Sequence, residues 1–526
     1  MARMTQGWAD GTPPPLSRRA RRARHEIVWW LAYLIVMLAG LAIGMMALQR
    51  IYFQPYFGFA WGCYLLLMAA WIWYPRLSLG AMLALTLTGD MITVWWFPFG
   101  KNLSSAESIM YLSNGVSVSP LEIMLVWGLA VTLYKNIAST GRPLRKTPLW
   151  YPLLVFGVFT LLGFVRGVSR GGDLRAAIFE VRPLILLPLL YILVVNVCRS
   201  RQDYRRLMWV ALAAITLQAL LSLQYLFRLP ATERDALQRL NEHGASIGAN
   251  LVLMALVASL AYRRVRWTTR LALLAASIPV TWVYLVAQRR AAIVALAVAF
   301  ALFAVMLFWR QRRTFWKVIP ICAVVMIGYL GAFWNSDSTA GFPAQAIKTV
   351  LAPEDASAED QSSDFYRQLE TLNLSATVRS APLLGIGFGQ PFLRPFPLPD
   401  ISVFEFNAYV PHNSFIWIWM KTGFGGFVAL IYIVGRTMMQ GARRARAAPD
   451  GDDAVVALSG VLFVAMYLIF LYVDIGWEPR NVFLFALTMG LCTGLIGVDN
   501  FDDPNDAKVF STDPRISSGH DRQLML

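Results

Sequence analysis

One stretch of the sequence, residues 374–430, organises the rest of the chain. It contains LSATVRSAPLLGIGFGQPF at 374–392, then a proline-rich passage, and VPHNSFIWIWMKTGFGGFVAL at 410–430. The first part closes the longest polar interruption of a very apolar chain, and the second part enters an apolar run that is long enough to cross a membrane. His412 lies at that point of entry. An ionisable side chain in this position indicates a functional site.

The composition predicts a membrane protein. Of the 526 residues, 57% are hydrophobic and 15% are charged, against about 25% charged in a soluble domain. The formal net charge of +16 indicates basic cytoplasmic loops, and no nucleic-acid partner is expected. The four cysteines form no CxxC motif, so we expect neither a disulfide framework nor a metal site.

The apolar runs predict an all-α polytopic membrane protein with about 14 transmembrane helices (about 12–14). One large external loop is expected to carry short amphipathic helices. The first run follows an arginine-rich leader without a small-residue cleavage site, so we expect a span and not a cleaved signal peptide. The predicted spans are roughly 27–48, 54–74, 78–98, 119–137, 149–166, 177–197, 206–227, 246–262, 270–287, 291–309, 316–334, 412–435, 454–473 and 480–497.

The distribution of Lys and Arg predicts the orientation of the chain. With the N-terminus in the cytoplasm, every second loop is basic, as the positive-inside rule requires. The long external segment then lies in the periplasm if the source is a Gram-negative bacterium. The predicted divisions are a basic cytoplasmic tail at 1–26, an N-terminal transmembrane bundle at 27–334, a large periplasmic loop at 335–411, C-terminal transmembrane helices at 412–497 and a disordered cytoplasmic tail at 498–526.

Several arginines contradict this charge rule. Arg289 and Arg290 form a tight outer turn that contains no acidic residue, whereas Arg175 and Arg182 lie on or just inside the outer face, at the start of the span 177–197. An arginine at the centre of a span costs about 2.5–3.5 kcal/mol, so charges placed against the topology indicate a local anionic partner. Snorkelling or pairing with a nearby acid is an equal alternative for any single arginine. For the turn with two arginines, function is the favoured interpretation.

The middle of the external segment predicts an amphipathic helix at 364–379. Apolar side chains recur there at helical spacing, and Arg367 and Arg379 lie on the other face. Ser363 or Asp364 would cap this helix, and Pro382 would end it. Such a helix can cover the bundle as a lid, although simple packing on the spans explains its apolar face equally well.

His412 follows Pro411 and precedes Asn413 at the start of a span. A helix N-terminus disfavours protonation of an imidazole, and a neutral imidazole can accept the proton of an attacking hydroxyl group. The alternative is a capping or interface histidine. His243, in a polar outer loop beside Glu242, is expected to be solvated.

The glycines of the stretch predict close backbone packing. Gly385, Gly387 and Gly389 form neither a Walker loop nor a dinucleotide-binding fingerprint, and a tight turn is the expected structure. Gly423 and its neighbours predict close helix packing or a kink. The last outer turn adds three charged residues, Asp474, Glu478 and Arg480, which could join the same pocket.

These motifs together resemble the O-antigen ligase/polymerase superfamily of bacterial membrane glycosyltransferases. In that family, a His-Asn/Ser/Gln pair is followed nine residues later by Gly-x-x-Gly/Thr/Tyr. This chain has His412-Asn413, nine residues, and then Gly423-Phe-Gly-Gly426. The Pro-Leu-Leu-Gly-Ile-Gly-Phe-Gly motif precedes the pair, and Gln288-Arg289-Arg290 is similar to the family's Ser-Arg-Gly-like turn, with Gln in place of Ser. The resemblance covers about 170–480.

The resemblance implies a GT-C-like fold and a metal-independent, inverting glycosyltransferase without a cofactor. The donor would be an undecaprenyl-pyrophosphate-linked glycan, used at the periplasmic face of the inner membrane. His412 would activate the acceptor hydroxyl. A guanidinium fork matches phosphate oxygens, so the donor pyrophosphate would bind Arg289, Arg290, Arg379 and Arg182. Supporting roles are implied for Asn413, Arg175, Arg367, Gly387 and Glu478.

The acceptor and the partners stay open at this point. A polymerase would extend a repeat unit, and a ligase would transfer the glycan to lipid A–core; the number of spans slightly favours a polymerase. Membrane lipids, a chain-length regulator and a flippase are the expected partners. The alternative function is a lipid-linked glycan flippase or transporter, which would favour an internal repeat and charges in both halves of the chain. No repeat is visible in the sequence.

Overall fold

The computed structural model describes residues 55–495, apart from 91, 95, 98, 142, 146, 236–239, 337, 356, 400–404 and 449–450. Within these residues, every regular element is a helix. Eleven of the helices are long and apolar enough to cross a membrane. The chain is therefore a multi-pass, all-α membrane protein, as its composition predicts.

In chain order, the transmembrane bundle consists of α2 (Pro55–Trp73), α3 (Pro75–Thr88), α4 (Pro120–Thr140), α5 (Trp150–Ser169), α6 (Leu174–Val197), α7 (Arg201–Arg228), α9 (His243–Ala261), α10 (Trp267–Ala287), α11 (Arg290–Arg310), α12 (Arg312–Phe333), α15 (Ser414–Ala447), α16 (Asp452–Val473) and α17 (Pro479–Thr493). The helices between them are α8 (Ala231–Asp235), α13 (Phe342–Leu351) and the longer α14 (Ala358–Ser380), with single 3₁₀ turns at Thr339–Gly341 and Pro353–Asp355.

The predicted span at 78–98 is wrong in its second half. Helix α3 ends at Thr88, and the carboxylate of buried Asp90 accepts hydrogen bonds from the backbone N–H groups of Ile92 and Thr93, both at 3.0 Å. These bonds hold a turn where the apolar pattern predicts more helix. At about 1.5 Å per residue, α3 and α17 are too short to cross a core of about 30 Å alone. The predicted span at 27–48 lies outside the described residues.

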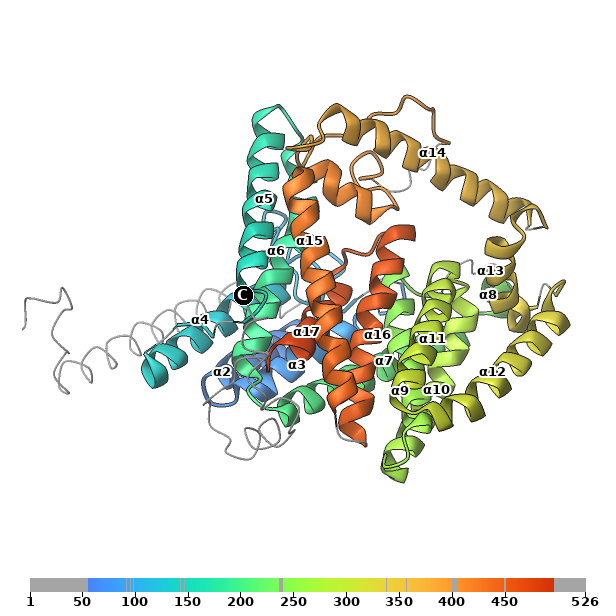
Figure 1. Cartoon of the computed structure of the whole chain (residues 1–526). Coiled ribbons are helices and arrows are strands. Elements are labelled where there is room, and N and C mark those ends of the chain that lie inside the picture. The colour runs from blue at the N-terminus through green and yellow to red at the C-terminus, as the bar shows by residue number, and fades with distance from the viewer. Residues whose placement is uncertain are drawn as a thin grey trace, which may run out of the picture.

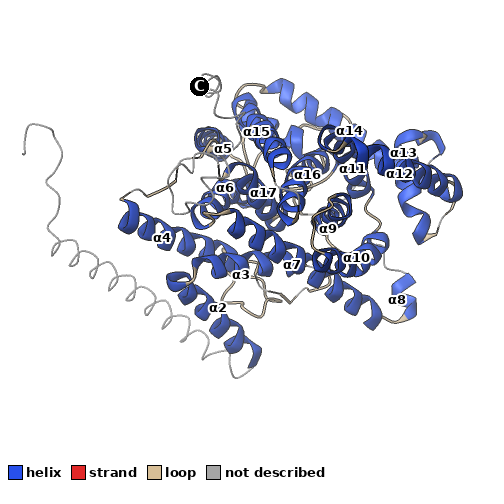
Figure 2. Cartoon of the chain, turned by 60° about the horizontal axis from the view of Figure 1, so that its bottom comes forward, coloured by secondary structure: helices blue, strands red, loops and turns tan. Residues whose placement is uncertain are grey.

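The bundle is built around α16 and is covered at one end by α14. In α16, 89% of the most apolar window is buried, and the helix packs on α9, α11, α15 and α17. Figure 1 shows α14 across the top of the bundle, above α15 and α16. We call this the α14 end. Viewed from below, α2, α3 and α4 lie together on one side, next to α6 and α7 (Figure 2).

The glycine-rich loop between α14 and α15 packs backbone against backbone. Gly387, with φ +93°, lies so close to α5 that an added Cβ would meet the backbone nitrogen of Gly167 at 2.5 Å. Gly423, with φ +74°, breaks the helical conformation inside α15 and faces the carbonyl of Leu383. A side chain at either glycine would push apart the two backbone segments that meet there. The tight turn and the kink that the sequence predicts are therefore confirmed.

A buried ion pair joins α6 to α15 beside this loop. The Nζ of Lys421 lies 2.7 Å from Oε1 of Glu180, and both side chains are fully buried. The other oxygen of Glu180 accepts a hydrogen bond from the backbone N–H of Gly389 at 2.6 Å. Trp417 donates to the same carboxylate through Nε1 at 3.2 Å. The charges are fully paired, which burial in an apolar bundle requires.

Candidate active site

The histidine singled out by the sequence is held by a buried carboxylate. The backbone N–H of His412 donates to Oε2 of Glu370 at 2.9 Å, and Nδ1 of its ring lies 3.3 Å from Oε1. The ring of Tyr366 stands edge-on to the imidazole, with centroids 5.8 Å apart. Glu370 is 2% exposed in its side chain and His412 24% exposed. One edge of the imidazole is therefore fixed, while the ring keeps access to solvent.

Helix α14 supplies this carboxylate from a buried polar stripe. Glu370, Asn373 and Thr377 recur at helical spacing, and all three are buried. Asn373 exchanges two hydrogen bonds with the backbone of Phe396, and Thr377 accepts one from the N–H of Leu393. The stripe thus binds the returning chain and aligns it toward His412. Sequence analysis overlooked it, although its spacing was a usable signal.

The predicted amphipathic helix of the external segment is confirmed, but it begins earlier than the sequence indicates. The predicted range was 364–379, capped by Ser363 or Asp364, whereas α14 spans Ala358–Ser380. Its N-cap is Ser357, whose hydroxyl accepts a hydrogen bond from the N–H of Asp360 at 3.2 Å. The acidic first turns lack apolar periodicity, so the hydrophobic pattern could not reveal them.

A second chain of polar contacts starts one residue after Asn413, the N-cap of α15. Ser414 donates to the carbonyl of Asp474 at 3.0 Å, and the carboxylate of Asp474 lies 2.9 Å from Nδ1 of His243. Arg289 continues the chain, with Nη1 3.2 Å from Nε2 of His243. The arginine turn and the start of α15 are therefore connected through His243, which the sequence had suggested was merely solvated.

The pKa values of the two acids in the last outer turn, Asp474 and Glu478, are shifted in opposite directions. Burial would raise the pKa of Asp474, but the hydrogen bond from His243 and the charges of His243, Arg367 and His412 lower it to about 2. For Glu478, burial and the nearby carboxylate of Glu242 raise the pKa to about 8. At neutral pH, one acid is charged and the other is protonated.

The remaining residues of the last outer turn lie apart from His412. Arg480 is buried and bonds the carboxylate of Asp90 and the carbonyl groups of Leu87 and Gly89 at the end of α3. The Oε2 atom of Glu478 is buried without a hydrogen-bond partner within the described part of the chain. Arg480 thus closes the end of α3, while Oε2 of Glu478 lies against Gly244 in the first turn of α9.

Arg290 and Arg367 both contact the first turns of α14. Nη1 of Arg290 lies 3.2 Å from Asp360 and 3.4 Å from Asp364. Arg367 pairs with Asp364 at 3.8 Å, and its charge contributes to the lowered pKa of Asp474. The arginine turn has no acid of its own, as the sequence indicates, but α14 supplies two, Asp360 and Asp364.

Three other predicted arginines are not brought next to His412. Arg379 is exposed in the last turn of α14, about 13 Å along the helix from Glu370. Arg182 makes a two-pronged contact with Glu122 and bonds Asn102. Positions 180 and 182 of a helix point about 200° apart, so α6 directs Glu180 toward α15 and Arg182 toward α4. Arg175 pairs with Glu405 at 2.7 Å on the surface.

The described residues contain no group of three or more His, Cys, Asp or Glu side chains that could hold a metal ion. The site contains the half-buried imidazole of His412 and the carboxylate of Glu370 that orients it. Its positive charges come from Arg289, Arg290 and Arg367. These groups lie on the arginine turn, on α14 and at the start of α15.

Comparison with protein families gives a match to part of the chain. Residues 275–431 match the family model of the O-antigen ligases. The O-antigen ligase match includes the arginine turn, the whole of α14, His412 and the break at Gly423, so the resemblance inferred from the motifs is confirmed. It supports a role in ligating or polymerising surface polysaccharide. A search of curated proteins found no match.

Proposed function

We propose that this protein is a metal-independent, inverting glycosyltransferase. It transfers a glycan from undecaprenyl pyrophosphate to a sugar hydroxyl in the synthesis of a bacterial surface polysaccharide. One observation carries the proposal: the imidazole of His412, which keeps access to solvent, is held by the buried carboxylate of Glu370 inside the O-antigen ligase match. A carboxylate behind an imidazole fixes its tautomer and its orientation, which general-base catalysis requires.

The proton transfer follows from this geometry. With its proton on Nδ1, His412 donates to Oε1 of Glu370 and leaves the lone pair of Nε2 for the acceptor. Nε2 takes the hydroxyl proton while the acceptor oxygen attacks the anomeric carbon. The bond from that carbon to the diphosphate breaks on the opposite face, which inverts the configuration. Glu370 then stabilises the imidazolium that forms.

The departing diphosphate needs positive charge, because its negative charge grows in the transition state. Arg289 and Arg290 are the best-supported partners, since both belong to the matched region and lie at the α14 end. Arg379 is exposed and would need movement of α14 to reach the same phosphates. For Arg182 to take part, its ion pair with Glu122 would have to open.

The orientation and the partners are part of the same proposal. The α14 end faces the periplasm, and the bundle lies in the inner membrane, because the basic loops belong at the opposite end. The acceptor is a repeat unit or lipid A–core, and a flippase supplies the donor. The unusual polar groups gather at one end of the bundle, which favours chemistry there over transport.

A transfer assay tests the proposal directly. Purified protein in lipid nanodiscs is given an undecaprenyl-pyrophosphate oligosaccharide and an acceptor, and the rate is followed by product formation. We expect His412→Ala to lower the rate by about 10²–10⁴-fold, the usual share of a general base. Glu370→Gln should lower kcat by less and leave KM unchanged, because Gln keeps a hydrogen-bond acceptor for Nδ1 but loses the charge that stabilises the imidazolium in the transition state.

Glu354→Gln is the matched control, since Glu354 is an exposed acid in the same external segment. It should keep both the kcat and the KM of the wild type. Wild-type transfer by a folded His412→Ala protein would refute the catalytic assignment. A folded Glu370→Gln protein with the kcat of the wild type would show that the charge of Glu370 takes no part in catalysis.

A further inference from the structure

Helix α14 brings three parts of the chain together in a fixed order. Its first two turns contact Arg290 of the arginine turn. Glu370, further along the helix, holds His412. The turns after Glu370 bind the returning segment 393–396. The arginine turn and this segment therefore meet α14 on opposite sides of His412.

Arg394 lies in the returning segment and is held in place on both sides. The backbone N–H groups of Leu393 and Phe396 each donate a hydrogen bond to α14, at 2.9 Å. The guanidinium of Arg394 packs over the ring of Phe392, 5.0 Å from its centroid, and donates to Oδ1 of Asn407 at 3.1 Å. These contacts orient a planar fork of donors that matches the oxygens of a carboxylate or a phosphate.

Tyr366 adjoins both His412 and Arg394. It lies one helical turn before Glu370, where the buried polar stripe of α14 becomes partly exposed, and its ring stands edge-on to His412. Burial and the charge of Glu370 raise the pKa of the Tyr366 hydroxyl to about 12, and the charge of Arg394 opposes this shift. The hydroxyl therefore stays protonated, and it makes no hydrogen bond within the part of the chain that the structure describes.

The charge of Arg394 is not neutralised by the protein. Its side chain is exposed, and it forms no ion pair with any described residue. Arg175 of the same end, by contrast, pairs with Glu405 at 2.7 Å. An arginine that is oriented by a ring and an amide, yet lacks an acid, is prepared for an anion from outside the chain.

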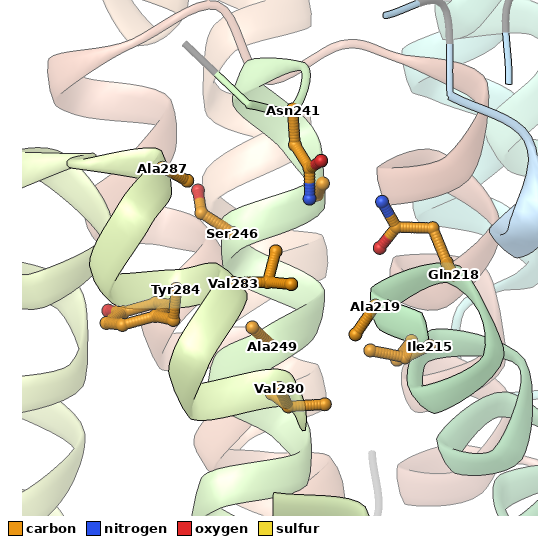
Figure 3. A pocket seen from close by; sticks show the side chains of 11 residues that line it. Ile215, Gln218, Ala219, Asn241, Ser246, Ala249, Val280, Val283, Tyr284 and Ala287 are labelled. Atoms are coloured by element: carbon orange, nitrogen blue, oxygen red, sulfur yellow. The ribbon is translucent and has the colours of Figure 1, made fainter. Parts of the chain in front are cut away.

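The acceptor saccharide has to reach His412 from this surface. The hollow between α7, α9 and α10 near the arginine turn is lined by Gln218, Asn241 and Ala249 (Figure 3), and it has room for about one water molecule. No sugar fits there. In an inverting displacement, the nucleophile and the leaving group lie on opposite faces of the anomeric carbon. With the diphosphate at the arginine turn, as proposed above, the acceptor enters from the side of Arg394.

We propose that Arg394 and Tyr366 form the acceptor subsite and that the acceptor is an acidic saccharide. Its carboxylate or phosphate group, close to the hydroxyl that reacts, binds the guanidinium of Arg394. The hydroxyl of Tyr366 bonds a neutral hydroxyl group of the same sugar. The inference rests on the proposed function and names the chemical class of its acceptor. A uronic acid would supply a carboxylate, and a phosphorylated core sugar would supply a phosphate.

Removing the charge from the acceptor tests the subsite on the wild-type protein. The acceptor of the transfer assay is used untreated, after reduction of its carboxyl groups to alcohols, and after enzymatic dephosphorylation. We expect at least one treatment to raise the acceptor KM by about fivefold, the share of a partly exposed ion pair, and that treatment identifies the anion. The kcat and the donor KM should change by less than about twofold, since the lost contact serves binding alone. Equal acceptor KM values for all three forms would overturn the proposal.

Arg394→Gln makes the matching change in the protein. It should raise the KM of the untreated acceptor by the same factor and leave the KM of the neutralised acceptor unchanged, because that ion pair is already absent. Arg394→Lys should recover part of the affinity. Arg170→Gln, at an exposed arginine of the same end, is the control and should behave as the wild type does. An equal loss for charged and neutral acceptors in Arg394→Gln would contradict a charge-specific role.

Tyr366→Phe tests the second member of the subsite. The variant keeps the ring against His412 and loses only the hydroxyl. It should raise the acceptor KM by about two- to fivefold for every form of the acceptor, the share of one hydrogen bond, and leave the donor KM unchanged. A wild-type acceptor KM would exclude Tyr366 from the subsite and leave it a packing role beside His412.

This proposal and the catalytic assignment fail differently. Binding of the three acceptor forms in the absence of donor, measured by titration calorimetry, requires no turnover. If binding depends on the charge and Arg394→Gln abolishes that dependence, but His412→Ala still transfers glycan, the subsite stands and the catalytic assignment falls. If His412→Ala abolishes transfer and the neutralised acceptor binds as tightly as the untreated one, the reverse holds.

Discussion

Two acids four residues apart, Asp474 and Glu478, differ in charge at neutral pH because of what surrounds them. The carboxylate of Asp474 has a hydrogen-bonded histidine and nearby cations, which lower its pKa to about 2. Burial raises the pKa of Glu478 to about 8, and the nearby carboxylate of Glu242 adds to this effect. The carboxylate of Asp474 beside His243 is therefore charged at neutral pH, whereas Glu478 is protonated.

This contrast predicts how stability depends on pH. The pKa of Glu478 is raised from 4.5 to about 8 on folding, so between these values the folded state binds one more proton than the unfolded state. Stability is therefore fully present below pH 4.5 and falls as the pH rises to about 8. Glu478→Gln should unfold at the wild-type temperature near pH 5 and at a higher temperature than the wild type at pH 9, measured by thermal unfolding in detergent.

Glu354→Gln serves again as the control, because Glu354 is exposed. Its unfolding temperature should follow that of the wild type across the whole pH range. A constant difference between Glu478→Gln and the wild type at every pH would mean that the substitution acts through packing and not through ionisation.

At the scale of elements, the loop at 385–389 shows what a motif can reveal. Its glycines predict a tight turn with close backbone contact. The glycines at and after Gly423 likewise predict close helix packing or a kink, and α15 breaks at Gly423. The partners of these glycines could not be predicted, because contact with α5 is set by tertiary packing. The same limit applies to Glu370: a single sequence identifies His412 as unusual but does not say which carboxylate will face it.

Gly387→Ala should therefore destabilise the protein strongly. The residue has φ +93°, and its new Cβ would meet the backbone of α5, which cannot move aside as a flexible side chain can. Backbone strain costs about 1–3 kcal/mol, and the clash adds to it. We expect a large drop in the yield of folded protein and in its unfolding temperature.

Gly141→Ala is the matched control for this prediction. Gly141 also has a positive φ, of +72°, but nothing lies within 4 Å of an added Cβ. It should lose only the conformational term, about 1–2 kcal/mol. Equal losses for the two variants would show that close packing on α5 contributes nothing.

For the whole molecule, apolar runs predicted most helices to within a few residues, since lipid leaves a long segment few alternatives to a helix. They failed at 78–98, where one buried acid, Asp90, outweighs the apolar pattern, and they could not place the short helix α17 in the centre of the bundle. The orientation in the membrane remains a prediction from charge.

Cysteine labelling tests that orientation. In a chain whose four cysteines are replaced by alanine, Arg379→Cys lies at the α14 end, and Arg443→Cys lies near the other end of α15; both side chains are exposed. A membrane-impermeant maleimide added to spheroplasts should label the first variant at once and the second only after permeabilisation. The opposite pattern would place the site in the cytoplasm.

The ion pair between Glu180 and Lys421 also has a consequence for how the chain is made. Glu180 enters the bilayer with α6, long before the ribosome has synthesised α15. Until then, the nascent protein holds an uncompensated acid among apolar spans, which the membrane tolerates poorly. A truncated product that ends before α15 keeps an unpaired acid in the membrane, and we expect quality-control proteases to degrade it. Synthesis of α15, which supplies Lys421, therefore allows the chain to persist.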